Sequence, residues 1–255
     1  MNRVAVCVAL LLAATTTGRA NSVVFATGAQ MLGGYAENAS ATFDINNSTH
    51  TITVHLLNLQ FDPLDVHQAI GSVRFTINGA GAPVPSMETA SGTVLDINSG
   101  GVIKNVAAMT TNVWQTAALL QGSGEQIALC AVCASGGTTG LIVGGPAASG
   151  KYDAADATLK GPTGTPWIIG SGASYVGGAL AGVDASPAWV INVGATNLSN
   201  LVITNVIFGF GEDANYGWNS ITVPQETPEP DSAILIGTGL ALMALAARAR
   251  RLRRP

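Results

Sequence analysis

The 255-residue chain has little charge and few aromatic rings. Charged residues make up 10% of it and aromatic residues 5%, whereas an average soluble domain has about 25% charged residues. Neither the G-x-S-x-G elbow of the α/β-hydrolases nor the H-E-x-x-H motif of zinc proteases occurs. No pair of carboxylates stands out as a general acid and base. The sequence therefore predicts no catalytic residue, no cofactor, no metal site and no enzyme activity.

Positive charge is scarce in the body of the chain. Between Asn21 and Glu226 four basic side chains face 13 acidic ones, a net charge of −9. A surface of that sign repels phosphate backbones. We therefore expect no nucleic-acid partner.

The first twenty residues have the layout of a secretory signal peptide. Arg3 gives a positive start, residues 4–14 form an apolar run, and Gly18 and Ala20 are small residues before a cut between Ala20 and Asn21. The alternative is an uncleaved anchor, but the run is shorter than the roughly 20 residues that span a bilayer. Segment 1–20 therefore predicts export by the Sec machinery and removal by signal peptidase.

The last residues combine an apolar run with a cluster of arginines. Residues 232–247 carry no charge, and as a helix they would span roughly 24 Å of a ~30 Å hydrocarbon core. Arginines near a membrane span are held on the cytoplasmic side. We therefore expect a transmembrane helix over 232–247, a cytoplasmic tail over 248–255, and the body of the chain on the far side of the membrane. The residues expected to stop membrane transfer are Arg248, Arg250, Arg251, Arg253 and Arg254.

A Pro-Glu-Pro motif, Pro228, Glu229 and Pro230, precedes that run within a linker over 223–231. Proline fixes φ and disfavours helix at the preceding residue, so the motif stays extended beside the membrane. This order of motif, apolar run and arginines resembles the PEP-CTERM sorting signal, which exosortase reads in Gram-negative bacteria. The resemblance covers residues 228–255 only.

The resemblance to PEP-CTERM proteins implies a destination and partners. It implies an exported protein that is held in the inner membrane by its C-terminal helix before exosortase processes it. The mature chain would then lie at the cell surface or outside the cell. The resemblance also implies an association with extracellular polysaccharide in a biofilm matrix.

Short β-branched or alternating runs separated by turn residues fill the body, residues 21–222. They predict an antiparallel β-sandwich, jelly-roll-like, with glycine-rich loops. Asn46, Asn78 and Asn98 each end such a run before a small or polar residue, which predicts hairpin turns. The best helix candidate is 112–122, and 65–70 suggests a single turn. Strands are expected over 41–46, 50–59, 71–78, 92–98, 101–109, 127–132, 140–145, 189–194 and 200–211.

Cys130 and Cys133 have the C-x-x-C spacing of a redox motif or of half a zinc site. A zinc site needs two more ligands, and only His50, His55 and His67 could help. His50 and His55 are five residues apart and would point to opposite faces of a strand. Outside the cytoplasm we favour a local disulfide, with free thiols and redox or metal chemistry as the alternatives.

Two further segments have a functional and a plain interpretation. Segment 62–67, "DPLDVH", brings Asp62 and Asp65 near His67, which suits a cation such as Ca²⁺ or an acid–base pair. Its plainer interpretation is a solvated loop that turns at Pro63. Segment 145–152 approaches a P-loop but has Tyr152 where Mg²⁺ binding needs Ser or Thr, so a glycine-rich loop is favoured.

These observations favour a non-enzymatic, structural or adhesive protein of the cell surface or extracellular matrix. The alternative is a carbohydrate-binding module that stacks sugars on its tryptophans, which we otherwise expect in the core. A secreted hydrolase ranks third, and it would require a pocket in which a histidine meets a carboxylate. The tryptophans are Trp114, Trp167, Trp189 and Trp218.

Overall fold

A computed structural model shows the β-rich body of the chain. The described residues are 21–78, 85–97, 101–109, 114–121, 124–131, 140–145, 151–152, 167–170, 186–194, 198, 201–211 and 220–223. The chain divides into two compact units, Met1–Pro224 and Gln225–Pro255, and every described residue belongs to the first. The signal peptide, the Pro-Glu-Pro motif, the apolar run and the arginine tail lie outside the described residues. Within the described part, no helix has the length and apolarity to cross a membrane.

One sheet has five antiparallel strands in the order β1-β4-β5-β14-β7. The sequence predicted strands at β4, β5 and β14 but not at β1 or β7. Along the three predicted strands, buried side chains alternate with more exposed ones. In β4, for example, Ala41, Phe43 and Ile45 are buried, while Thr42 and Asp44 lie on the outer face. The strands are β1 (Asn21–Ala26), β4 (Ala39–Asn46), β5 (Thr51–Asn58), β7 (Ser86–Ser91) and β14 (Ala188–Asn192).

The second sheet has nine strands, ordered β10-β11-β6-β12-β13-β8-β9, with β15 and β16 continuing from the other side of β6. All its pairs are antiparallel except β12 with β13. Its strands are β6 (Ile70–Asn78), β8 (Thr93–Ile97), β9 (Ile103–Ala108), β10 (Gln115–Gln121), β11 (Gly124–Cys130), β12 (Ile142–Val143), β13 (Trp167–Ile169), β15 (Val202–Phe210) and β16 (Ser220–Val223).

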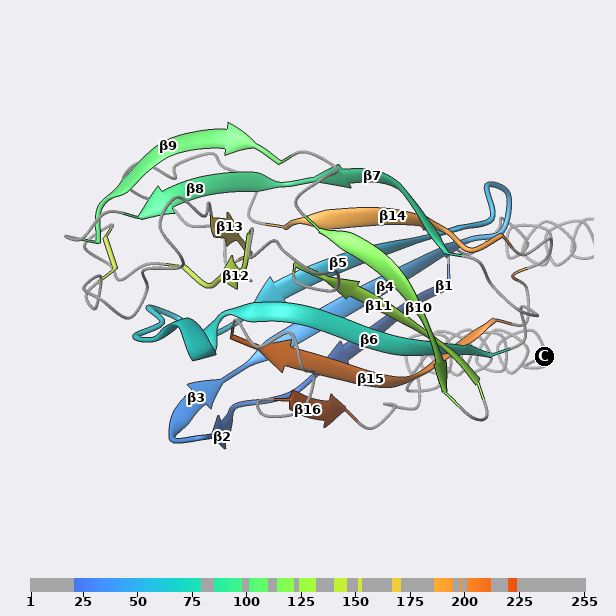
Figure 1. Ribbon diagram of the computed structural model, residues 1–255, viewed down its shortest axis with the longest axis horizontal. Coiled ribbons are helices and arrows are strands. Elements are labelled where there is room, and N and C mark those ends of the chain that lie inside the picture. The colour runs from blue at the N-terminus through green and yellow to red at the C-terminus, as the bar shows by residue number, and fades with distance from the viewer. Residues whose placement is uncertain are drawn as a thin grey trace, which may run out of the picture. The chain divides into compact units, whose positions relative to one another are not determined.

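A small hairpin and one short 3-10 helix complete the described elements. The hairpin pairs β2 (Gln30–Leu32) with β3 (Tyr35–Glu37), and the helix η1 (Val66–Gln68) lies between β5 and β6. Both lie at the same end of the sheets (Figure 1). The single turn expected over 65–70 is therefore confirmed.

The two large sheets share one hydrophobic core. Phe43 of the five-stranded sheet meets Phe75 of the nine-stranded sheet with ring centroids 4.8 Å apart, and Phe25 meets Phe43 edge-on at 5.7 Å. All three rings are fully buried. Figure 1 shows β6, β11 and β15 lying over β1, β4 and β5. The described fold is thus all-β and β-sandwich-like, as the strand pattern predicts.

Of the three predicted hairpin turns, the structure confirms one and contradicts another. Asn46 does close a hairpin: its Oδ1 accepts hydrogen bonds from the Ser48 and Thr49 amides, and β4 pairs with β5. The strands β8 and β9 on either side of the third predicted turn also pair as neighbours. The prediction at Asn78 is wrong, because β6 and the next strand, β7, belong to different sheets.

The helix predicted over 112–122 is also wrong. Residues Gln115–Gln121 form β10, which pairs with β11 along its whole length. Its sequence, QTAALLQ, consists of good helix formers. Pairing with β11 and the burial of Trp114 at the start of the segment outweigh that preference, because tertiary packing decides between states that differ by a few tenths of a kcal/mol per residue.

Candidate functional site at the β5–β6 loop

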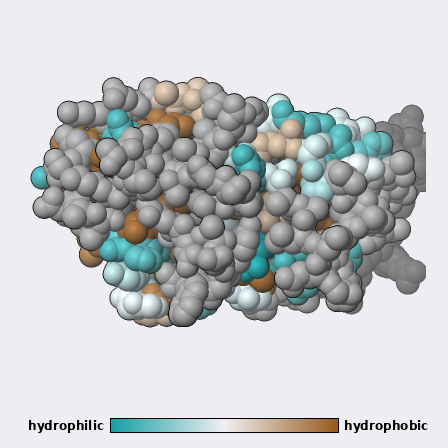
Figure 2. Space-filling view, in the orientation of Figure 1, coloured by the Kyte–Doolittle hydropathy of each residue, from teal (hydrophilic) through white to brown (hydrophobic). Residues whose placement is uncertain are grey.

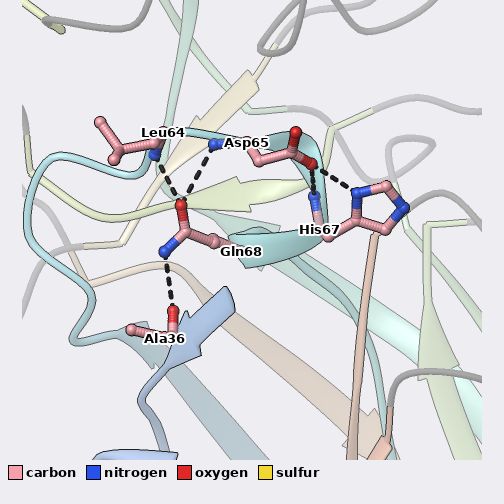
Figure 3. Close-up of polar contacts among 5 residues, drawn as sticks. All are labelled: Ala36, Leu64, Asp65, His67 and Gln68. Atoms are coloured by element: carbon pink, nitrogen blue, oxygen red, sulfur yellow. Dashed lines mark hydrogen bonds and ion pairs between the residues drawn. The ribbon is translucent and has the colours of Figure 1, made fainter. Parts of the chain in front are cut away.

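Hydrogen bonds of Asp65 and Gln68, at the two ends of η1, hold the loop between β5 and β6. Asp65 caps the helix, and its carboxylate accepts a hydrogen bond of 2.9 Å from the His67 amide. The Gln68 side chain closes the box: its Oε1 accepts from the Asp65 and Leu64 amides at 3.1 and 2.6 Å. Its Nε2 donates to the Ala36 carbonyl at 2.8 Å, which ties η1 to β3 (Figure 3).

The His67 ring is held on three sides. Its Nδ1 meets the same Asp65 carboxylate oxygen in a short hydrogen bond, which becomes an ion pair when the imidazole is protonated. The Tyr35 ring stacks on it, with centroids 5.3 Å apart and planes 13° from parallel. Gly211 packs against the residue as well, since a Cβ there would lie 3.4 Å from the His67 Cδ2. The ring is therefore oriented, yet 47% of the side chain is exposed.

Asn58 fastens this loop to the sheets. Its buried Nδ2 donates to the Gln68 carbonyl at 2.7 Å and to the Ile142 carbonyl at 3.0 Å. Its Oδ1 accepts from the Gln60 amide at 3.0 Å. One side chain thus joins β5, η1 and β12, and every polar atom of its amide group has a partner.

Glu37 lies at the end of β3 and is fully buried. Neither of its carboxylate oxygens has a hydrogen-bond partner within the described part of the chain. Burial without a partner disfavours the charged form, and it raises the pKa of the Glu37 carboxyl from 4.5 to about 8. Glu37 and Tyr35 are two residues apart on one strand, so both side chains lie on the same face.

The chemistry available here is that of one oriented imidazole. Asp65 engages Nδ1, which leaves Nε2 as the ring nitrogen that can take a proton or a ligand. The predicted meeting of His67 with Asp65 occurs. For Asp62, the structure shows its amide donating to the Gly145 carbonyl at 2.8 Å. Among the described residues, no group of three His, Cys, Asp or Glu side chains could hold a metal ion.

The other two histidines lie apart from this loop. His55 on β5 pairs with Asp44 on β4, with 3.3 Å between Nε2 and Oδ2, and both side chains are more than a third exposed. Such a surface pair contributes little to stability. His50 ends the β4–β5 turn with a positive φ of 58°, and its carbonyl accepts from the Val193 amide.

Cys130 and Tyr152, two other residues singled out in the sequence, take part in contacts that hold the fold together. Cys130 is disulfide-bonded and its partner lies outside the described residues, as does Cys133. Tyr152 is buried, and its hydroxyl donates to the Gly144 carbonyl at 2.8 Å. The hydrogen bond therefore joins the last residue of segment 145–152 to the backbone just before that segment, of which residues 146–150 lie outside the described residues.

Two of the four tryptophans belong to the core. Trp114 and Trp189 are buried with ring centroids 4.8 Å apart, and the Trp114 indole donates to the Gly140 carbonyl at 2.6 Å. They are not available for stacking on a sugar. Trp218 lies outside the described residues, and of Trp167 only the backbone, in β13, is described.

Apolar side chains are exposed near the ends of β2 and β5. Met31, Phe61 and Leu64 are each more than half exposed, and the Leu64 side chain points away from the Asp65–His67 pair (Figure 3). Among the coloured residues on the face in view, the brown apolar ones appear as small spots (Figure 2). Single exposed apolar residues of this kind are normal for a soluble domain.

Comparison with known proteins gives no relative. No family model matches the sequence, and no curated protein matches it. Five chains of solved structures match. One is the Clostridium perfringens NetB toxin in its membrane-inserted form, at 12% identity over 82% of this chain and 93% of that chain, with a TM-score of 0.16. A TM-score that low supports no statement about fold or function.

Proposed function

We propose that the chain is an exported, non-enzymatic protein with a structural or adhesive role at the cell surface or in an extracellular matrix. The observation that carries this proposal is the order of three features at the C-terminus: Pro228-Glu229-Pro230, the uncharged run 232–247 and five arginines. That order is what a sorting enzyme of the exosortase type would read, and segment 1–20 supplies the export signal. The body over 21–222 is then a jelly-roll-like ectodomain.

Three features of the ectodomain suit this role. Its described tryptophan rings pack in the core. Each of its two described histidine–carboxylate pairs presents one partly exposed imidazole, and its charge is low and negative. A surface of that kind makes many weak contacts. It offers no described constellation of nucleophile, base and oxyanion donors of the kind that catalysis needs.

Sorting can be tested in an exosortase-bearing Gram-negative host with matched charge variants of the linker. In Glu229→Gln the motif loses its charge, whereas in Glu226→Gln the same change falls three residues earlier, outside the motif. We expect Glu226→Gln to lose residues 1–20 and its C-terminal segment, as the wild type does. Glu229→Gln should retain the C-terminal segment and stay in the inner-membrane fraction.

Fractionation followed by intact-mass measurement reads out both ends of the chain. A full-length, unprocessed chain in the cytosol would contradict the proposal. For the adhesive role, biofilm mass of a deletion strain should recover with the wild type and Glu226→Gln but not with Glu229→Gln. Tryptophan fluorescence that quenches on addition of the host polysaccharide would instead favour the carbohydrate-binding alternative.

A further inference from the structure

Within the described part of the chain, the outer edge of β1 carries unpaired backbone groups at known positions. β1 is the first strand of the five-stranded sheet, and among the described strands only β4 pairs with it. The Thr27 amide donates to the Ala39 carbonyl, and the Leu59 amide donates to the Asn38 carbonyl. The backbone groups of β4 therefore alternate, with odd-numbered residues facing β1 and even-numbered residues facing β5.

The same alternation fixes which residues of β1 face outward. Thr27 points its amide to β4, so Phe25, Val23 and Asn21 do the same. The N–H and C=O groups of Ser22, Val24 and Ala26 then point to the open edge. Side chains alternate as well: Phe25 is buried in the core, whereas 49% of Val24 is exposed on the outer face.

Within the described residues, the sequence and register of β1 have none of the features that prevent strand pairing at an edge. Natural edge strands carry lysine, proline, a bulge or an inward charge, or are very short. β1 has six residues, NSVVFA, without charge or proline, and its register with β4 is unbroken. By contrast, β7 at the other edge of the sheet carries Glu88 and a register shift against β14.

We propose that β1 is a self-association edge, which pairs antiparallel with β1 of a second copy of this chain about a two-fold axis at Val24. In that register Ser22 faces Ala26 of the second copy and Val24 faces its own equivalent, so all three outward residues meet outward residues. Each such pair exchanges two backbone hydrogen bonds. Val23 lies opposite Phe25 of the second copy on the core side, which extends the apolar layer across the junction.

The sequence of β1 selects a second copy as the occupant. The strand is self-complementary: it presents no charge that a copy of itself would repel, and its exposed β-branched Val24 gains an identical neighbour. The contact is one strand long, so the dimer is weak and transient compared with standard interfaces. The inference depends on β1 alone and holds whether or not the proposed sorting is correct.

Cysteine cross-linking of the full chain in mild detergent tests the register. In the proposed dimer the two Val24 Cα atoms lie about 5.5 Å apart, within the range that a disulfide bridges. The Ser22 Cα atoms lie about 13 Å apart, because they are offset by four residues along the strand. After mild oxidation, Val24→Cys should run at twice the chain mass on a denaturing, non-reducing gel, while Ser22→Cys and the wild type should show no covalent dimer.

Association through another surface, including the C-terminal segment, would not favour position 24 over position 22. Equal cross-linking at positions 22 and 24 overturns the proposal. The absence of cross-linking at position 24 overturns it as well, and would mean that β1 pairs with a strand of another protein or with no strand. Val24→Lys supplies an independent check, since it places two like charges opposite each other. It should abolish the concentration-dependent rise in mass, whereas Thr89→Lys on the β7 edge should leave that rise unchanged.

Discussion

Replacement of Glu37 by glutamine should stabilise the protein at neutral pH. In the folded chain the Glu37 carboxyl is fully buried without a hydrogen-bond partner in the described part, and its pKa is about 8. In the unfolded chain the same group has its ordinary pKa of 4.5. The folded state therefore binds the proton more tightly, and stability falls as pH rises from 4.5 towards 8.

The magnitude follows from those two pKa values. Each pH unit inside the window lowers the free energy of unfolding by about 1.4 kcal/mol. Between pH 4.5 and pH 7 the wild type should lose at most about 3 kcal/mol through Glu37. The Glu37→Gln variant carries no titrating group there, so this contribution to its pH dependence disappears.

Urea unfolding at pH 4.5, 6, 7 and 8, followed by tryptophan fluorescence, measures the effect. All other titrating groups are shared, so the difference between wild type and Glu37→Gln isolates this carboxyl. That difference should grow with pH and level off near pH 8. Glu88→Gln, which removes an exposed carboxylate bound to the Asn192 amide group, serves as the control and should leave the pH dependence unchanged. Parallel curves for wild type and Glu37→Gln would refute the reasoning.

Urea unfolding of five further variants tests the packing around the candidate site and in β15. Asn58→Leu leaves the Gln68 and Ile142 carbonyls and the Gln60 amide without their partner, and should cost about 3 kcal/mol or more; an unchanged midpoint would exclude the role given to Asn58. Gly144→Ala places a Cβ 1.7 Å from the Gln60 carbonyl oxygen, and it should destabilise the protein by several kcal/mol, roughly as an overpacked core does. The control, Gly28→Ala, has open space around it and should cost only about 1 kcal/mol of backbone strain. Asn205 has a φ of 52° at the register shift in β15, so Asn205→Gly should be tolerated and Asn205→Val should lose about 1–2 kcal/mol; equal stability of the two would contradict a left-handed backbone there.

Period-two patterns predicted most of the strands because each buries one face. The run at 41–46 became β4 with its odd-numbered residues inside, and the run at 200–211 became β15. The prediction failed where the local signal was weak or misleading. β10 consists of helix formers, and β7, with the sequence SMETAS, has little apolar character. In both strands, pairing with a neighbouring strand decides the structure. The neighbour of β7 is β14, which is distant from it in the sequence.

The candidate site was only half visible in the sequence. Segment 62–67 placed Asp65 near His67 in the sequence, and the structure adds that Asp65, directly before the helical turn, caps it. Tyr35 and Asn58 could not be placed beside them, because their partners lie 32 and 10 or more residues away along the chain. The role of Tyr35 arises from the packing of β3 against η1, and that of Asn58 from the approach of β5 to η1 and β12.

Glu37 did carry a signal, and it shows how the alternation rule can be extended. Ala39, Ala41 and Phe43 are core residues of β4, and Glu37 falls on the same parity two residues earlier. A prediction based on residue type would end the buried face at Ala39, because a carboxylate side chain is expected to be exposed to solvent. In the structure the burial continues to Glu37, and it raises the pKa of the carboxyl to about 8. An acidic residue that continues the parity of a buried face is thus a candidate for a raised pKa, and the unfolding experiment on Glu37→Gln tests that inference directly.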